Sequence, residues 1–206
     1  MIDPVRFITN RSSGKQGYEI ANSLVENGFD TTLISGPTNL KPNDNLKLIK
    51  VKTGEEMHKK TMELLPCDLA IFTAAVSDFK VKKFNKEKIK KNKDQSFNLD
   101  LNPDILELVS KSNKKQKIVV GFAAETENLF DNARSKLGKK CCDLIGFWQT
   151  KCSFLQFLFE NKIKKKLSPP PLQISPLPFR QNFEIFDALK FHKNHHLNHN
   201  PLLHIL

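Results

Sequence analysis

The sequence predicts an α/β fold with a mostly parallel sheet and flanking helices, and two patterns support this prediction. Apolar runs of strand length alternate with amphipathic segments of helix length through residues 1–145. Residues 69–76 are apolar nearly throughout, as in a central strand covered on both faces. The carboxyl end of such a strand faces the ligand crevice of a parallel sheet, so we expect functional residues after this run.

The first elements follow from helical faces and turn residues. Ile20, Ala21, Leu24 and Val25 share one helical face, and the pair Asn27-Gly28 ends that helix. A strand is expected over residues 31–35. Thr53 and Glu56 have the spacing of a capping box, which predicts a helix that continues to about Leu65.

The later elements continue the alternation. Phe97, Leu99 and Leu101 alternate with polar residues, as in a strand. Pro103 suits the first turn of a short helix after Asn102. We expect a buried strand over residues 118–122, a helix over residues 127–140, and another apolar segment at residues 143–145.

The composition narrows the classes of partner. Lysine and arginine number 33 against 22 acidic residues, which favours nucleic acid, a membrane surface or small polyanions. The four cysteines lack Cys-x-x-Cys spacing, so we expect free thiols. No run of about 20 apolar residues and no signal peptide is visible, so we expect a cytoplasmic protein without a membrane partner.

Residues 146–206 differ from the rest of the chain. They hold 8 of the 16 Phe, 6 of the 11 Pro and 5 of the 6 His, and their apolar residues follow neither helical nor strand periodicity for long. We therefore predict a domain boundary near Ile145 and an irregular, basic tail after it.

Several segments are candidates for a site, each with a structural alternative. Residues 10–17 combine glycine, hydroxyl and amide groups at the start of a helix. They either bind an anion or cap the helix in the ordinary way. Residues 74–78 end the central strand with small residues followed by Asp78. The Asp78 carboxylate either faces a ligand in the crevice or belongs to an ordinary turn. The eight lysines of residues 80–93 form a closing clamp or a solvated loop. Phe122 stacks on a base or packs in the core.

The order of these motifs resembles phosphopantothenoylcysteine synthetase over about residues 2–145. The motifs that carry the resemblance are Asp3-Pro4-Val5-Arg6 through Lys15, Ala74 to Asp78, Lys88-Ile89-Lys90-Lys91, Asn102 to Leu106, and Gly121 to Thr126.

The resemblance implies a Rossmann-like homodimer in coenzyme A biosynthesis. Such an enzyme uses CTP and Mg²⁺ to activate the carboxylate of 4′-phosphopantothenate as an acyl-cytidylate, and cysteine then displaces CMP. FMN belongs only to the decarboxylase domain that is often fused to it. By motif position, the resemblance implies catalytic roles for Asn10, Lys88 and Arg6. It implies nucleotide binding by Phe72, Thr73, Ala74, Asp78, Pro103, Asp104, Ile105, Leu106, Phe122, Lys136 and Lys140.

The resemblance fails at both ends. The family begins with a strand and a Gly-Gly-Thr turn, whereas this sequence starts just before Asp3. We expect a partial ligase domain over residues 1–145 that lacks its first strand. For residues 146–206 we consider a frameshift: read from the third base of its Trp codon, Trp148-Gln149-Thr150 gives Ala followed by Asn or Asp, close to the family's Ala-Asn segment.

Alternative functions stay open. A catalytically inactive nucleotide-binding fragment of the enzyme has the same motifs. A nucleic-acid module is disfavoured because the lysine run has only Phe79 beside it and Phe84 within it. An NAD-dependent oxidoreductase lacks its G-x-G-x-x-G fingerprint. We expect no nucleic-acid partner.

Overall fold

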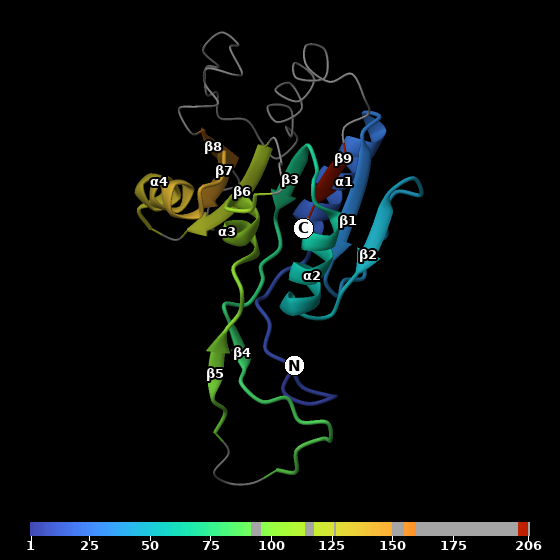
Figure 1. The fold of residues 1–206 in the computed structure, drawn as a ribbon, viewed down its shortest axis with the longest axis vertical. Coiled ribbons are helices and arrows are strands. Elements are labelled where there is room, and N and C mark those ends of the chain that lie inside the picture. Colours follow the sequence, from blue (N-terminus) through green and yellow to red (C-terminus); the bar gives the residue numbers. More distant parts are fainter. Residues whose placement is uncertain (92–95, 114–117, 126, 150–154, 160–201, 206) are drawn as a thin grey trace.

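The computed structural model describes residues 1–91, 96–113, 118–125, 127–149, 155–159 and 202–205. Figure 1 shows helices on both faces of a sheet and a separate hairpin that extends from one end of it. The helices are α1 (Lys15–Glu26), α2 (Gly54–Leu64), α3 (Ile105–Ser110) and α4 (Leu129–Lys140). The strands are β1 (Asp30–Ser35), β2 (Lys47–Lys50), β3 (Leu69–Phe72), β4 (Phe79–Val81), β5 (Leu99–Leu101), β6 (Ile118–Glu125), β7 (Leu144–Gln149), β8 (Leu155–Phe159) and β9 (Leu202–Ile205).

The predicted parallel sheet is confirmed within the described residues. Its strand order is β2-β1-β9-β3-β6-β7-β8, and every neighbouring pair is parallel except β7 with β8. Strands β4 and β5 form a separate antiparallel pair.

Two apolar clusters hold the helices to opposite faces of the sheet. Tyr18 and Leu24 of α1 pack with Leu33 and Ile71 on one face. Met57 of α2, Val109 of α3 and Ala133 of α4 belong to the cluster on the other face. We call the first the α1 cluster and the second the α2 cluster. Successive strand residues such as Leu33 and Ile34 therefore face different clusters, as expected of strands buried on both sides.

The helix ends follow local signals with small shifts. As predicted, α1 ends at Asn27-Gly28, where Gly28 has a φ of 79°. Thr53 Oγ1 accepts from Glu56 N at 3.1 Å, but the Glu56 carboxylate accepts from Lys52 N and not from Thr53. Helix α3 begins at Ile105 with Asp104 as its cap, later than predicted.

Strand β3 is shorter than the apolar run that predicted it, because the chain leaves the sheet after Phe72. The loop after the strand is also apolar, but not because it belongs to the sheet. Its residue Val76 packs against the α2 cluster from outside the strand.

Strand β7 runs through Ile145 to Gln149, so the predicted boundary falls within a strand. Two further described segments after it are also strands, β8 and β9, so the expected irregularity does not hold for them. Backbone pairing gives the reason: β7 bonds to β6 through Glu125↔Gln149, and β8 bonds to β7. Residues 150–154, 160–201 and 206 lie outside the described part of the chain.

Strand β9 fills the centre of the sheet. Its residues pair in parallel with both β1 and β3, and Ile205 faces Leu33 on one side and Ile71 on the other. Residues 1–14 contain no strand ahead of α1. Residues 202–205 supply the strand between β1 and β3.

We predict that Ile205→Asp destabilises the whole domain. The Ile205 side chain is 0% exposed in the α1 cluster, so a carboxylate there would be buried without a partner. The free energy of unfolding should fall by about 3 kcal/mol or more, measured by urea denaturation. The matched control is Leu40→Asp, at a side chain that is 37% exposed. Equal stability of the two variants would contradict the central position of β9.

The described cysteines are free, as predicted, and differ in exposure. Cys67 and Cys142 are buried, whereas Cys141 is exposed. Burial raises the pKa of Cys67 to about 12 and that of Cys142 to about 11. Cys152 lies outside the described residues.

We predict selective alkylation at pH 8. The raised pKa keeps Cys67 and Cys142 protonated, and their burial blocks the reagent. Iodoacetamide should therefore modify Cys141 first, and the other two only in urea, as followed by peptide mass spectrometry. Rapid native labelling of Cys67 would show that its surroundings are open.

Candidate functional site

The candidate site lies where the parallel strands end. In this topology the carboxyl ends of β1, β3 and β6 share one edge of the sheet with the N-termini of the helices. The loop after β3, residues 73–78, leads from this edge to the β4–β5 hairpin. Figure 1 shows the N-terminal segment running beside that hairpin.

Side chains from distant segments hold the loop after β3. Asn10 Nδ2 donates to the carbonyl of Val76 at 3.2 Å, and Asn102 Nδ2 donates to the carbonyl of Ser77 at 2.8 Å. Helix α2 is also close, because a Cβ added to Gly54 would lie 3.1 Å from a methyl group of Val76. Asn10 therefore contacts the loop after β3.

Helix α1 approaches the same loop. A Cβ added to Gly17 would lie only 2.8 Å from Thr73 Oγ1, so the first turn of α1 packs directly on the residue that follows β3. Gly14, just before the helix, has a φ of 72°, which favours glycine. Ser12 and Ser13 hydroxyls accept from the N–H groups of Gly14 and Lys15. Gly14 is the N-cap of α1 and has no side chain to cap it, so these two bonds are turn contacts at the start of the helix.

A second group of predicted residues meets between α3 and α4. Asp104 Oδ1 caps α3 by accepting from Glu107 N at 2.9 Å, and its other oxygen lies 2.6 Å from Lys140 Nζ. Lys140 also pairs with Glu107 at 3.1 Å. The hydrogen bond to Asp104 raises the pKa of Lys140, against the effect of burial, and the bond to Glu107 adds to the rise. Lys140 is therefore a cation whose present partners are carboxylates.

Lys136 lies one helical turn before Lys140 and donates to the carbonyl of Phe122 at 2.9 Å. The Phe122 side chain is 9% exposed and packs in the α1 cluster. The structure therefore favours the core alternative for this ring over stacking on a base. Phe122 lies inside β6, paired with Gly146 of β7, and its carbonyl is bonded to Lys136.

The remaining candidates on the strand ends differ in exposure. Phe72 and Ile105 are buried in the α2 cluster, and Leu106 packs against Gly121. Thr73 and Pro103 are half-buried, whereas Ala74 and Asp78 are exposed. The Asp78 carbonyl accepts from Asn102 N at 2.8 Å, which ties the loop after β3 to the segment before α3. The buried members shape this edge, and the exposed members are available to a ligand.

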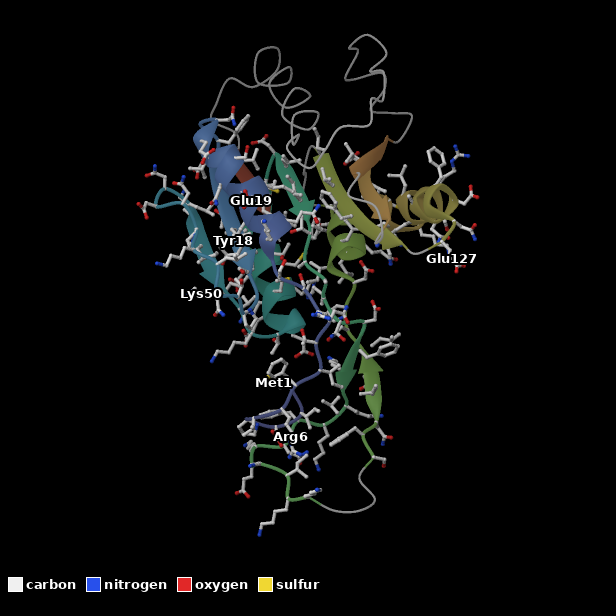
Figure 2. The ribbon with its side chains drawn as sticks, turned by 180° about the vertical axis from the view of Figure 1, so that it is seen from behind. Met1, Arg6, Tyr18, Glu19, Lys50 and Glu127 are labelled. Atoms are coloured by element: carbon white, nitrogen blue, oxygen red, sulfur yellow. The ribbon has the colours of Figure 1, made fainter. Side chains whose placement is uncertain are left out.

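Arg6 and Lys88 lie on the N-terminal segment and the lysine run, not in the loop after β3. The Arg6 guanidinium pairs with Asp3 and donates to the carbonyl of Ile89 at 2.7 Å. Figure 2 shows Arg6 on the part of the molecule that extends below the sheet, well apart from Tyr18 of α1. Lys88 is exposed, next to this contact. The predicted catalytic role of Arg6 is thus accompanied by a structural one.

Sequence reasoning missed Asp3, Glu55 and Glu107 as partners of the site. Glu55 forms an ion pair with Lys80, and Glu107 pairs with Lys111 and Lys140. The local signals were the spacing of Asp3 with Arg6, three residues apart, and of Glu107 with Lys111, four residues apart. No group of three or more His, Cys, Asp or Glu side chains suited to a metal ion occurs within the described ranges. No described helix is both long and apolar enough to cross a membrane.

Comparison with known proteins agrees with this geometry. Residues 1–153 match the family model described as DNA/pantothenate metabolism flavoprotein C-terminal domain. The coenzyme A biosynthesis bifunctional protein CoaBC of Borreliella burgdorferi is 40% identical over 149 residues, covering 70% of this chain and 38% of that protein. CoaBC of Haemophilus influenzae is 42% identical over 146 residues, covering 70% and 36%. The chain therefore spans less than two fifths of the length of these relatives.

Solved structures show the same fold. The crystal structure of the C-terminal domain of CoaBC has a TM-score of 0.71 and 30% identity, and the match covers 94% of this chain and 86% of that one. A Cab2 mutant in complex with phosphopantothenate-cysteine also has a TM-score of 0.71, at 20% identity, over 92% and 81% of the two chains. With its strand-end site and its match over residues 1–153, the chain belongs to the family of the DNA/pantothenate metabolism flavoprotein C-terminal domain.

Proposed function

We propose that this chain acts as a phosphopantothenate–cysteine ligase domain in coenzyme A biosynthesis, in the cytoplasm. The observation that carries the proposal is the hydrogen bond from Asn10 to Val76, which brings the N-terminal motif to the end of β3. The family match, the CoaBC relatives and the phosphopantothenate-cysteine named with the Cab2 structure support it.

The proposed reaction has two steps. The carboxylate of 4′-phosphopantothenate attacks the α-phosphorus of CTP, which forms an acyl-cytidylate and releases pyrophosphate. The amine of cysteine then attacks the acyl carbon, an amide bond forms, and CMP leaves with the bonding electrons. The protein must supply positive charge and correct positioning, because 4′-phosphopantothenate and CTP are both polyanions.

The described residues divide this work between two places. The exposed Ala74 and Asp78 suit contacts with the nucleotide at the end of β3. Lys136, bonded to the Phe122 carbonyl, and Lys140, paired with Asp104, suit contacts with its phosphates. A nucleotide phosphate that replaces this carboxylate would find a cation already in place. Lys88 would bring further positive charge when the lysine run closes.

Mg²⁺ would enter with the nucleotide. Magnesium in nucleotide sites is usually held by one or two carboxylates together with substrate phosphates, so a dedicated protein cage is unnecessary. The exposed carboxylate of Asp78 at the strand end fits that donor set. When bound, the ion neutralises phosphate charge. CTP is the proposed nucleotide, and pyrophosphate release measured with CTP and with ATP tests the choice.

An inactive nucleotide-binding fragment is the second candidate. The observation that favours it is that Lys140 and Lys136, cations suited to a nucleotide phosphate, are positioned by Asp104 and by the Phe122 carbonyl whether or not a reaction follows. CTP binding without pyrophosphate release from the full chain would select this second function.

We predict that substitution of Asn10 blocks only the second step, whereas substitution of Lys88 slows both. Asn10→Asp should still release pyrophosphate but fail to release CMP, because activation precedes amine attack and a new negative charge at the strand end disfavours the second step. Lys88→Gln should slow both steps by roughly 10²-fold, as loss of a charge-stabilising group does. Pyrophosphate and CMP are measured separately with cysteine present.

The control for these variants is Lys47→Gln, an exposed lysine at the amino end of β2, on the opposite edge of the sheet from the candidate site. Its rates should match those of the unmodified chain. Normal CMP release by Asn10→Asp would refute the role assigned to Asn10.

We also propose that the domain forms a homodimer through the hairpin. Phe79 on β4 and Leu99 and Leu101 on β5 are exposed apolar side chains, and Phe97 lies next to them. Exposed apolar side chains gathered on one short hairpin are typical of an interface. The family resemblance implies the same state.

We predict that Leu101→Glu, at a side chain that is 71% exposed, converts the dimer to a monomer. A charge in the apolar part of an interface must be desolvated when the two copies associate. Sedimentation velocity gives the mass of the chain and of the variant. Phe130→Glu on α4, also exposed, should leave the dimer intact. A monomeric unmodified chain would refute the proposal.

A further inference from the structure

The Asp3 carboxylate is completely buried although it lies in the N-terminal segment. One oxygen, Oδ1, accepts from the backbone N–H groups of Val5 at 2.9 Å and Arg6 at 2.8 Å. The other, Oδ2, accepts from the Arg6 guanidinium, with 2.9 Å to Nε, and from Ile89 N at 3.1 Å. Oδ1 thus binds the backbone of the N-terminal segment, and Oδ2 binds the Arg6 side chain and the backbone of Ile89.

These contacts keep the carboxylate charged. The hydrogen bond from Arg6 holds the pKa of Asp3 well below its usual value, against the effect of burial, and the backbone donors of Val5, Ile89 and Arg6 act in the same direction. An ionised carboxylate accepts stronger hydrogen bonds than a neutral one. Asp3 is therefore a fixed negative charge at neutral pH.

Asp3 joins two segments that are distant in sequence. Arg6 Nη2 also donates to the carbonyl of Ile89 at 2.7 Å, so both backbone groups of that residue are bound. Asn85 N donates to the carbonyl of Ile2 at 3.0 Å. Residues 85 and 89 are thus attached to residues 2–6, and Lys88 lies between the two attachments.

The lysine run needs such an attachment. Residues 80–93 carry eight lysines, whose mutual repulsion opposes any single arrangement of the segment. The buried Asp3 carboxylate binds the backbone of this run and not its ammonium groups, which leaves Lys88 exposed. The same N-terminal segment continues to Asn10, which is bonded to Val76. Residues 2–10 thus connect the lysine run to the end of β3.

We propose that Asp3 is a positioning residue that holds Lys88 in place through Ile89 and Arg6. The proposal rests on the ligase function proposed above, in which Lys88 supplies charge to the reaction. Asp3 itself touches no substrate in this scheme. Its carboxylate sets where the backbone on the C-terminal side of Lys88 lies.

Asp3→Asn is the sharpest test variant. An amide has one acceptor oxygen, whereas the carboxylate uses two. In either orientation of the new side chain, an NH₂ group faces N–H donors. The volume is nearly unchanged, so the variant removes the attachment without leaving a cavity. Arg6→Lys is a second variant, which keeps the positive charge but loses the planar group that spans Asp3 and Ile89.

Hydrogen exchange of the full chain without substrates tests the attachment. Asp3→Asn should raise the exchange rates of the Asn85 and Ile89 amides by about tenfold or more, with unchanged rates in β3 and β6, since the lost contacts are local. Arg6→Lys should raise the rate at Ile89. The control is Asp30→Asn, which removes the exposed pair with Lys47 on the sheet. Unchanged exchange at Asn85 and Ile89 would overturn the proposal.

A double-mutant cycle tests whether Asp3 acts through Lys88. Asp3→Asn should lower kcat/KM for pyrophosphate release by about tenfold in the unmodified chain and by less than twofold in a Lys88→Gln background. Equal losses in both backgrounds would overturn the role of Asp3 as a positioning residue. If the unmodified chain releases no pyrophosphate, the proposed function fails, and the exchange experiment still decides whether Asp3 holds the lysine run.

Discussion

The fold depends on unbroken backbone pairing across the centre of its parallel sheet. A strand in the interior of a sheet has N–H and C=O groups on both sides, and leaving them unpaired in an apolar layer is costly. Strand β9 meets this requirement between β1 and β3. With that position filled, α1 can pack across Ile205 and its neighbours as one continuous cluster.

The site is a consequence of this sheet. Because the parallel strands end at one edge, the loop after β3, the caps of the helices and the backbone of β6 gather there from distant parts of the sequence. Amide side chains then fix the loop, with Asn10 and Asn102 each donating to one of its carbonyls. Carboxylates hold Lys140 at this edge, with Asp104 at 2.6 Å.

The parts of the chain outside the sheet are held by electrostatics. The N-terminal segment and the lysine run contribute little to the apolar clusters, and their order comes from the bonds of Asp3 and Arg6. A buried ionised carboxylate is tolerated only when its oxygens are fully bonded. The arrangement of the N-terminal segment and the lysine run therefore depends on the Asp3 carboxylate, whereas the sheet depends on its apolar clusters.

The sequence by itself determined the α/β class, β1 to within one residue, the C-terminal end of α1 and Thr53 as the cap of α2, and it predicted a site at the strand ends. Each of these follows from short-range periodicity or from motif order. It also indicated Asn10, Lys88, Lys136 and Lys140 by resemblance. Tertiary structure decided that Phe122 packs in the core, that β7 crosses residue 145, that Asp3 binds Ile89 and that residues 202–205 complete the sheet. These contacts join residues that are far apart in the chain. The spacing of apolar residues and local motifs predict helices and strands, but they do not encode which distant segments pair with each other.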